Sequence, residues 1–155
     1  MQRVRVTLRE VRDDDLEVLY QNQADPQSGA MAGVAVRDRA GFLAHQARVD
    51  ADPVAVRRVI QLDDGTVAGD IASWCDADSG DRVVGYRIGR QYWGQGIASA
   101  ALPLFLAELT ERPLYAHVLE SNIRSVRVLE KCGFVRLAED DPHNDDPETL
   151  GYVLA

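Results

Sequence analysis

The stretch of sequence that decides the fold lies between residues 83 and 102. It reads Val83-Val84-Gly85-Tyr86-Arg87-Ile88-Gly89-Arg90-Gln91-Tyr92-Trp93-Gly94-Gln95-Gly96-Ile97-Ala98-Ser99-Ala100-Ala101-Leu102. The first half is rich in β-branched and aromatic residues and ends at a glycine, which is typical of a strand. The second half has the apolar spacing of a helix that begins near residues 94–96, with one face made of Ile97, Ala101, Leu102 and Phe105. The stretch therefore predicts a strand that turns directly into a helix.

The turn between the two halves has the form Gln91-x-x-Gly94-x-Gly96. Two glycines at a strand-to-helix junction allow the backbone to come close to a ligand. The free N–H groups and the dipole of the helix N-terminus then favour an anion. The turn therefore predicts a site for a phosphate or a pyrophosphate.

Two common nucleotide motifs do not fit this turn. A Walker loop needs Gly-Lys-Ser/Thr, and the stretch contains no lysine. A dinucleotide fingerprint needs G-x-G-x-x-G within a βαβ unit, whereas here the spacing differs and the preceding strands have hairpin turns between them. On these residues alone, an ordinary glycine-rich turn without a ligand remains the alternative.

A second motif lies downstream and reads Asn122-Ile123-Arg124-Ser125-Val126-Arg127-Val128-Leu129-Glu130-Lys131-Cys132-Gly133-Phe134. The first motif resembles the acyl-CoA motif Gln/Arg-x-x-Gly-x-Gly/Ala of the GCN5-related N-acetyltransferases (GNAT family). The second resembles the family's Asn-x-x-Ser-x-x-x-Leu-Glu-Lys-x-Gly-Phe. The form Gly-Tyr-x-Ile-Gly-x-x-Tyr-Trp-Gly-Gln-Gly-Ile-Ala is similar to the branch of the ribosomal-protein N-terminal acetyltransferases (RimJ/RimL-like).

The resemblance implies one α/β (α+β) domain over residues 1–155 with the GNAT fold. This fold has a mixed, mostly antiparallel sheet of about seven strands, four flanking helices, and a splay between the fourth and fifth strands. The hydrophobic pattern predicts the same order of elements. The strands are expected at residues 3–9, 54–62, 67–75, 82–89, 114–119, 134–137 and 148–154. The helices are expected from a cap at Asp13 to residue 24, from a cap at Asp38 to residue 49, at 96–109, and from residue 121 or 122 to 132, with loop at 26–36.

Composition narrows the class of protein. The 155 residues are 46% hydrophobic and 27% charged, which are values typical of a globular domain. No apolar run is as long as a membrane span, and the first residues lack a signal-peptide core, so we expect a cytoplasmic protein without a membrane partner. Cys75 and Cys132 are far apart and the three histidines have no ligand spacing, which predicts reduced thiols and no metal site.

The net charge of −8 argues against a nucleic-acid partner, which would need a basic face. It mildly favours a cationic acceptor such as an amine. A role in solubility explains more of this negative charge, because many of the acidic residues fall in turns.

The sequence does not decide whether the protein forms a homodimer.

The resemblance also implies which residues bind acetyl-CoA, the expected cosubstrate. Gln91 would help to hold the pyrophosphate. The pyrophosphate would lie on the backbone N–H groups of Gly94, Gln95, Gly96, Ile97 and Ala98. The pantetheine arm would pair like an extra strand with the backbone of Tyr86, Arg87, Ile88 and Gly89. Asn122 would hydrogen-bond the same arm, although capping of the helix by Asn122 and Ser125 is the alternative. Arg127 and Lys131 could approach the phosphates of the cofactor or lie on the solvent-exposed face of the helix, and we favour the exposed position for each.

The implied reaction moves an acetyl group from acetyl-CoA to a primary amine, whether a protein N-terminus, an antibiotic or a small metabolite. Many relatives carry a tyrosine that protonates the CoA thiolate, but this sequence has Leu129 there and Ser125 is the nearest replacement. Some relatives carry a glutamate base where this sequence has His117, whose pKa would suit a base near pH 7. Other groups that could take the proton are Asp70, Glu120, Tyr86 and a chain of water molecules.

These two departures keep open an alternative in which the domain binds acyl-CoA without catalysis and acts as a regulatory or interaction module. Acceptor specificity in the family lies near the first two helices, where Met31 and Phe42 occur. For Phe42, packing in the core is the preferred interpretation.

Overall fold

The computed structural model describes residues 4–28, 36–144 and 146–155. Its seven-stranded sheet has the order β1-β2-β3-β4-β5-β7-β6. All neighbouring strands are antiparallel except β4 and β5, so the predicted mixed, mostly antiparallel sheet is confirmed. The strands are β1 (Val6–Arg9), β2 (Val56–Leu62), β3 (Val67–Cys75), β4 (Arg82–Ile88), β5 (Leu114–Leu119), β6 (Val135–Arg136) and β7 (Thr149–Leu154).

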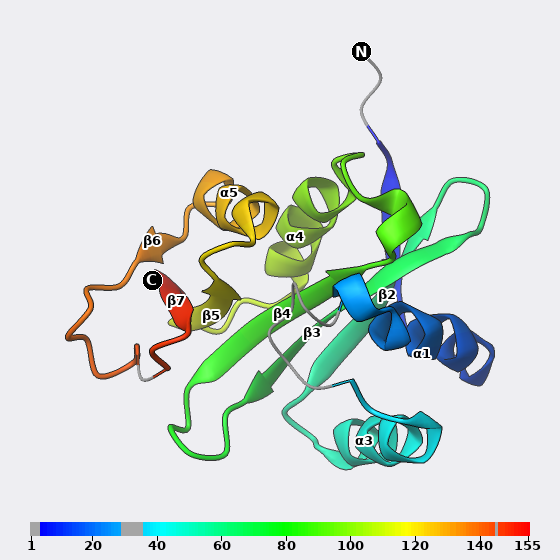
Figure 1. Ribbon diagram of the computed structural model, residues 1–155, viewed down its shortest axis with the longest axis horizontal. Coiled ribbons are helices and arrows are strands. Elements are labelled where there is room, and N and C mark those ends of the chain that lie inside the picture. Colours follow the sequence, from blue (N-terminus) through cyan, green and yellow to red (C-terminus); the bar gives the residue numbers. More distant parts are fainter. Residues whose placement is uncertain (1–3, 29–35, 145) are drawn as a thin grey trace.

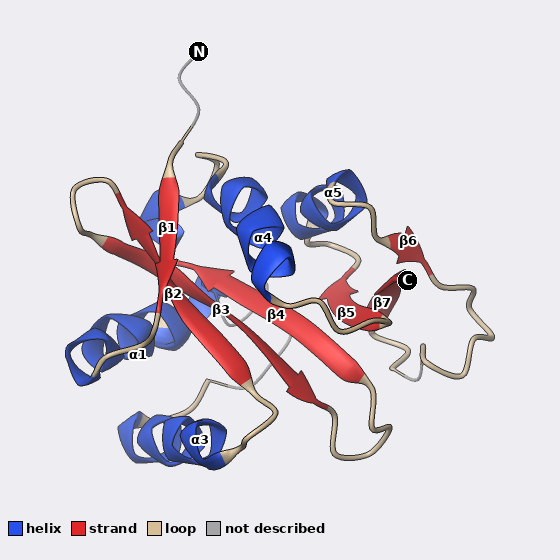
Figure 2. Cartoon of the chain, turned by 180° about the vertical axis from the view of Figure 1, so that it is seen from behind, coloured by secondary structure: helices blue, strands red, loops and turns tan. Residues whose placement is uncertain are grey.

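Helices cover both faces of this sheet, as expected. On one face lie α1 (Leu16–Ala24) and α3 (Arg39–Ala51), and on the other lie α4 (Ile97–Glu108) and α5 (Ile123–Lys131) (Figure 1). From behind, α4 crosses in front of the sheet while α1 lies beyond it (Figure 2). Two 3-10 helices, η1 (Asp13–Asp15) and η2 (Arg90–Tyr92), lead into α1 and toward α4.

The strands β4 and β5 separate almost at once. Val83 and Tyr115 form their only bridge, whereas β4 pairs with β3 from Arg82 to Ile88. Strand β5 pairs instead with β7 over its whole length. The sheet is therefore splayed between its fourth and fifth strands, as the resemblance implied.

The main core lies between the sheet and the α4–α5 face. The apolar face predicted for the helix after the glycine turn is buried there: Ile97, Ala101, Leu102 and Phe105. A smaller core under α1 and α3 contains Leu19, Phe42 and Val59, and the Phe42 ring packs edge-on against Tyr20. Phe42 is thus a core residue, in agreement with the preferred interpretation.

Most element boundaries agree with the sequence, and the differences have local causes. Asp13 does not cap α1, because residues 13–15 form a 3-10 turn in which Asp15 accepts the Arg12 N–H at 2.7 Å. Residues 26–28 are helical rather than loop, since the Asp25 side chain accepts the N–H groups of Gln27 and Ser28. Strand β6 is limited to two residues. Met31 lies outside the described residues.

The predicted ends of α3 and α5 are confirmed. Asp38 caps α3 by accepting the Gly41 N–H at 2.7 Å. Gly133 follows α5 with a φ of 95°, and Phe134 N–H returns to the Leu129 carbonyl at 3.0 Å. This is the glycine-terminated helix end that the sequence predicted.

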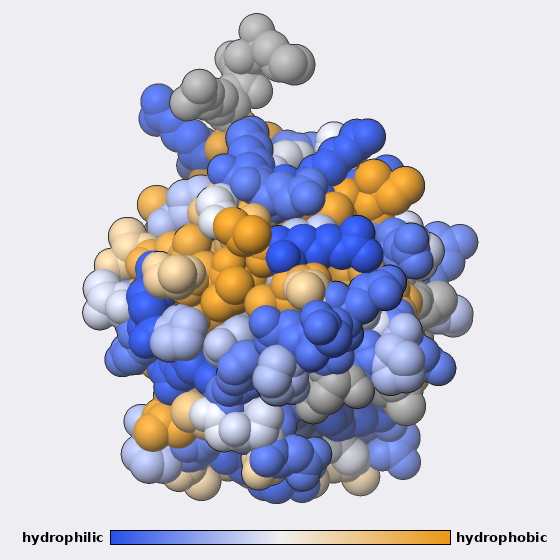
Figure 3. All heavy atoms as spheres, turned by 90° about the vertical axis from the view of Figure 1, so that its left-hand side faces the viewer, coloured by the Kyte–Doolittle hydropathy of each residue, from blue (hydrophilic) through white to orange (hydrophobic). Residues whose placement is uncertain are grey.

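Polar and charged side chains cover much of the face shown in Figure 3, and apolar side chains are visible in its middle. Across the described ranges, no helix combines the length and apolar character needed to cross a membrane.

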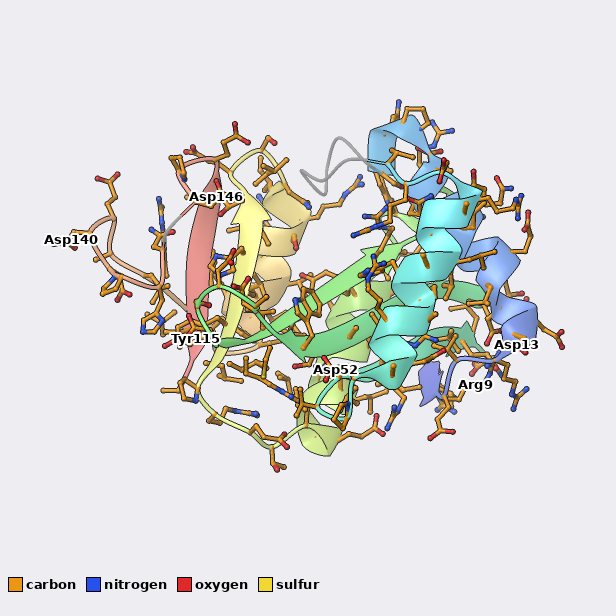
Figure 4. The ribbon with its side chains drawn as sticks, turned by 90° about the horizontal axis from the view of Figure 1, so that it is seen from below. Arg9, Asp13, Asp52, Tyr115, Asp140 and Asp146 are labelled. Carbon is orange, nitrogen blue, oxygen red and sulfur yellow. The ribbon has the colours of Figure 1, made fainter. Side chains whose placement is uncertain are left out.

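One buried ion pair fastens α1 to the sheet. Arg9, at the end of β1, makes two hydrogen bonds of 2.8 Å with the carboxylate of Asp15, which is 5% exposed. The Arg9 side chain also donates to Gln61 on β2. Figure 4 shows Arg9 at this corner, close to Asp13 and the start of α1. The hydrogen bonds from Arg9 hold the pKa of Asp15 below its usual range.

We expect Asp15→Asn to lower the free energy of unfolding at neutral pH by about 3 kcal/mol, because it leaves a largely buried guanidinium without its counter-charge. The folded-state pKa of Asp15 is lowered, so its contribution is present above the unfolded pKa of about 3.9 and is lost as pH falls through the folded value. The difference between variant and wild type should therefore shrink in acid. Denaturant unfolding at pH 7 and near pH 3 measures this.

Glu17→Gln is the matched control, because Glu17, two residues after Asp15 in α1, forms an exposed pair with Arg39 of α3. Exposed pairs contribute little, so this variant should unfold almost like the wild type. Equal losses in the two variants would contradict the role given to the Arg9–Asp15 pair.

Candidate functional site

A cavity of about 440 Å³ occupies the opening beside β4. Its walls come from three directions: the outer part of β4, the turn into α4, and one face of α5. The lining residues are Ser28, Tyr86, Arg87, Ile88, Tyr92, Trp93, Gly94, Gly96, Ile97, Ala98, Ser99, Asn122, Arg124, Ser125, Arg127, Val128 and Lys131. Both motifs singled out from the sequence therefore meet in one place.

The glycine turn presents backbone donors to this cavity. Gly94 and Gly96 have φ values of 79° and 77°, which other residues rarely adopt. Gly96 is the N-cap of α4 and no side chain caps this helix. The first N–H groups of α4 therefore have no partner within the helix, and Ile97 and Ala98 lie among the lining residues.

Three predicted cofactor residues lie at the edge of this arrangement. Gln91 and Gln95 are exposed and do not line the cavity, and the Gln95 amide donates to the Gln91 carbonyl at 3.4 Å. Gly89 also lies outside the lining, with its N–H bonded to the Ala68 carbonyl at 2.8 Å. The backbone of the turn, rather than the two glutamine side chains, forms the wall.

The free edge of β4 forms the second wall. Since Gly89 directs its N–H toward β3 and backbone groups alternate along a strand, those of Tyr86 and Ile88 face the opening. The Trp93 indole donates to the Ile88 carbonyl at 2.8 Å. The N–H groups of both residues and the Tyr86 carbonyl remain on the edge of the cavity.

Helix α5 supplies the third wall. Asn122 caps the helix by accepting the Ser125 N–H at 3.3 Å and also lines the cavity, so the structural and ligand-contact interpretations are compatible. Arg127 and Lys131 are exposed to solvent, as we favoured from the sequence, but they also line the cavity. Arg124 lines it as well, with its guanidinium over the Trp93 ring at 5.7 Å from the centroid.

The hydroxyl groups of Tyr86 and Ser125 meet in the cavity at 2.8 Å. Burial, opposed by the hydrogen bond to Ser125, raises the pKa of Tyr86 to about 12. Tyr86 is therefore a neutral hydroxyl at physiological pH and a poor base. The sequence suggested the Tyr86 side chain only as a proton acceptor and did not predict its bond to Ser125, although Tyr86 shares its strand face with Val84 and Ile88, which pack toward the helices that follow.

Two of the candidate proton acceptors, His117 and Asp70, lie on the opposite face of the sheet from Tyr86. His117 is exposed on β5, opposite Gly151, and does not line the cavity. Asp70 is half-buried on β3, opposite Arg87 of β4, and burial raises its pKa to about 6 despite the nearby positive charge of Arg87 and Arg57. Glu120 is exposed in the turn after β5.

Solved structures with the same fold include several acetyltransferases. An acetyltransferase from Agrobacterium tumefaciens str. C58 is 21% identical and superposes with a TM-score of 0.81, covering 100% of this chain and 93% of its own. The spermidine N-acetyltransferase from Vibrio cholerae, in complex with CoA and spermine, is 17% identical with a TM-score of 0.77, covering 96% and 92%. The microcin C7 self-immunity acetyltransferase MccE, in complex with acetyl-CoA and AMP, is 17% identical with a TM-score of 0.72, covering 96% and 91%.

At this level of identity these structures establish the fold alone. Among curated proteins, no sequence matches this chain significantly. The family model of the acetyltransferase (GNAT) domain, by contrast, matches residues 5–135, which include both motifs and all three walls of the cavity. The chain therefore belongs to the GNAT family of acetyltransferase domains.

Proposed function

We propose that this protein transfers an acetyl group from acetyl-CoA to a primary amine. The observation that carries the proposal is the single cavity in which the α4 turn, the free edge of β4 and the Tyr86–Ser125 pair come together. Each of these suits one part of the expected cosubstrate, as follows.

The α4 turn would hold the pyrophosphate, because its unpaired N–H groups and the helix dipole favour an anion. Arg124, Arg127 and Lys131 line the same cavity and would add positive charge toward the phosphates. The edge groups of Tyr86 and Ile88 would pair with the amides of the pantetheine arm as a neighbouring strand does. Asn122 would reach the same arm.

In the reaction, the amine nitrogen attacks the thioester carbonyl carbon, the C–S bond breaks, and the sulfur leaves with the electron pair. The attacking nitrogen must first lose a proton, since an alkylamine is mostly ammonium at neutral pH. The backbone N–H groups on the edge of β4 are suited to stabilise the charge that develops on the carbonyl oxygen.

Ser125 would supply the proton or hydrogen bond that the departing sulfur needs. If Tyr86 donates to the Ser125 oxygen, the Ser125 proton is left for the sulfur. A neutral tyrosine beside the serine thus compensates for the tyrosine that Leu129 replaces.

His117 remains our proposed base. It lies on β5 two residues beyond the Val83–Tyr115 bridge, on the strand that borders the opening, and is accessible to an acceptor. Asp70 is one strand further away, on β3.

The Tyr86–Ser125 pair favours catalysis over the alternative of an inactive acyl-CoA-binding module, which would not need two hydroxyls at the thioester. The ribosomal-protein branch stays part of the proposal, supported by the Gly85–Ala98 motif and by Ser125.

We expect acetyl-CoA at about 100 times its Kd to raise the Tm by roughly 5–10 °C, because it binds only the folded state. Gly96→Asp should abolish this shift by bringing a negative charge to the phosphate turn. Gly80→Asp is the matched control: Gly80 has a φ of 75° and, like Gly96, open space around it, but lies in the β3–β4 turn. Differential scanning calorimetry with and without acetyl-CoA measures the shift. If both variants lost it, backbone strain rather than charge would be the cause.

We expect Ser125→Ala and Tyr86→Phe each to lower kcat by roughly 10-fold, the effect of one lost hydrogen bond in the transition state. Since the two hydroxyls act on the same sulfur in series, the double variant should be little slower than Ser125→Ala alone. Steady-state rates of CoA release by the wild type, the two single variants and the double variant give the double-mutant cycle. Multiplicative losses would mean that Tyr86 does not act through Ser125.

We expect His117→Ala to lower kcat by about 10²–10⁴-fold and to flatten the acid limb of the pH–rate profile. A base takes up a proton only in its unprotonated form, so the wild-type rate should fall as the pH is lowered. The pKa of Asp70 is raised to about 6, so an acid limb is expected for either group and the wild-type profile cannot distinguish them. Asp70→Asn is therefore measured beside it. If His117→Ala kept the acid limb of the pH–rate profile and Asp70→Asn lost it, Asp70 rather than His117 would be the base.

A further inference from the structure

Arg87 is a half-buried cation whose role is not explained by the proposed chemistry. It lies on β4 between Tyr86 and Ile88, so its side chain is on the opposite face of the strand, yet it also lines the cavity. In the described part of the chain, no hydrogen bond or ion pair reaches its guanidinium. Burial lowers the pKa of Arg87, with Asp70 opposing and Arg37 adding to the effect.

Ser28 lines the cavity beyond the end of α1, and its hydroxyl has no hydrogen-bond partner among the described residues. Its side chain is 3% exposed, and its Oγ makes no hydrogen bond within the described ranges. A buried hydroxyl without a partner is uncommon, and rotation about the Cα–Cβ bond would turn it toward a ligand. A guanidinium and a hydroxyl at one cavity wall are groups that bind a carboxylate or a phosphate.

Arg87 lies in a positive region, although the chain as a whole is negative. The charges of Arg37 and Asp70 act on Arg87, and the charge of Arg57, which pairs with Asp50, acts on Asp70. Three arginines here face two carboxylates. Arg37 is fixed in place by Gln23, which accepts its N–H at 3.0 Å and donates to its carbonyl at 2.8 Å. Burial and the charges of Arg37, Arg48 and Arg57 lower the pKa of His45 in the same region.

The location separates this positive region from the phosphate turn. The turn and α5 lie on the α4–α5 face, whereas Arg87 and Ser28 belong to the side of α1 and α3. Figure 4 shows β3 and β4 running between the β5–β7 pair and these two helices. A cosubstrate held by the α4 turn would therefore leave the Arg87 wall to the second substrate.

We propose that the acceptor is an amine that carries an acid group, a carboxylate or a phosphate, which binds to the guanidinium of Arg87 with the hydroxyl of Ser28. This proposal rests on the proposed acetyl transfer and names the substrate class for it. It differs from the cationic acceptor that the net charge alone would favour.

The experiment compares amines with and without the acid group. One pair is glycine and glycinamide, which tests a carboxylate, and the other is phosphoethanolamine and ethanolamine, which tests a phosphate. The quantity of interest is the ratio of kcat/KM within each pair, measured in wild type, Arg87→Gln, Arg87→Lys and Ser28→Ala. The intrinsic reactivity of each amine cancels when a variant's ratio is divided by that of the wild type.

We expect Arg87→Gln to reduce the preference for the acid-bearing amine of one pair by roughly 10–100-fold, the effect of losing a charge-assisted hydrogen bond. Arg87→Lys should restore part of it, and Ser28→Ala should reduce it less. Arg57→Gln is the matched control, since Arg57 lies on the same face but pairs with Asp50 and does not line the cavity. Its ratio should equal that of the wild type.

An unchanged ratio in Arg87→Gln, or an equal fall in Arg57→Gln, would overturn the proposal. So would a loss of the acetyl-CoA thermal shift in Arg87→Gln, because Arg87 would then bind the cosubstrate. If no amine were acetylated, the proposed transfer would fail, and the thermal shift caused by glycine or phosphoethanolamine in the presence of CoA would decide the binding claim. A thermal shift that occurs in the wild type and is lost in Arg87→Gln would support the proposed binding of the acid group. The absence of a thermal shift with both compounds would contradict it.

Discussion

The separation of β4 from β5 is the constraint on which the rest of the molecule depends. Backbone N–H and C=O groups need partners, and a strand edge inside a protein is normally filled by its neighbour. Here Val83 and Tyr115 make the only bridge, and the β4 edge beyond it is left to other groups. The Trp93 indole donates a hydrogen bond to the Ile88 carbonyl, and the hydrogen bond between Tyr86 and Ser125 connects β4 to α5 across the gap. What remains is an edge with open hydrogen-bonding groups at the bottom of a cavity, which is the property that an amide-bearing ligand requires.

The rigid parts around this opening give it a fixed shape. Helix α4 is held by side chains in the main core, so its N-terminal turn is aimed at the cavity by packing rather than by loop residues. On the other face, the Arg9–Asp15 pair anchors the start of α1, and α1 leads to Ser28 at the cavity wall. Sites that rest on packed helices and strands keep their geometry better than sites on loops. The ion pair at the β1 corner is thus linked to the position of Ser28 in the cavity wall.

The sequence predicted the sheet, the two helices after the glycine turn and many of the residues that line the cavity, because these depend on short-range patterns. Gly94 and Gly96 were assigned from local backbone requirements, and Gly133 from a helix-end rule. The Tyr86–Ser125 bond joins residues 39 positions apart, and nothing local to either residue indicates it. The same holds for Ser28, whose position depends on how α1 packs. The Asp13 cap was wrong because Asp15, two residues later, forms a tertiary ion pair with Arg9.

Charge shows the same contrast between the whole chain and a single site. A net charge of −8 describes the average over the surface, and many of the acids lie in turns such as the Asp140–Asp146 loop, far from α1 in Figure 4. A bound acceptor responds to the groups within several ångströms of it, since exposed charges beyond about 10 Å are screened at moderate salt. Around Arg87 those groups are Asp70 and Arg37, and the partial burial of Arg87 strengthens its attraction for an anion. The chemistry of the acceptor is therefore better inferred from this wall of the cavity than from the composition of the chain.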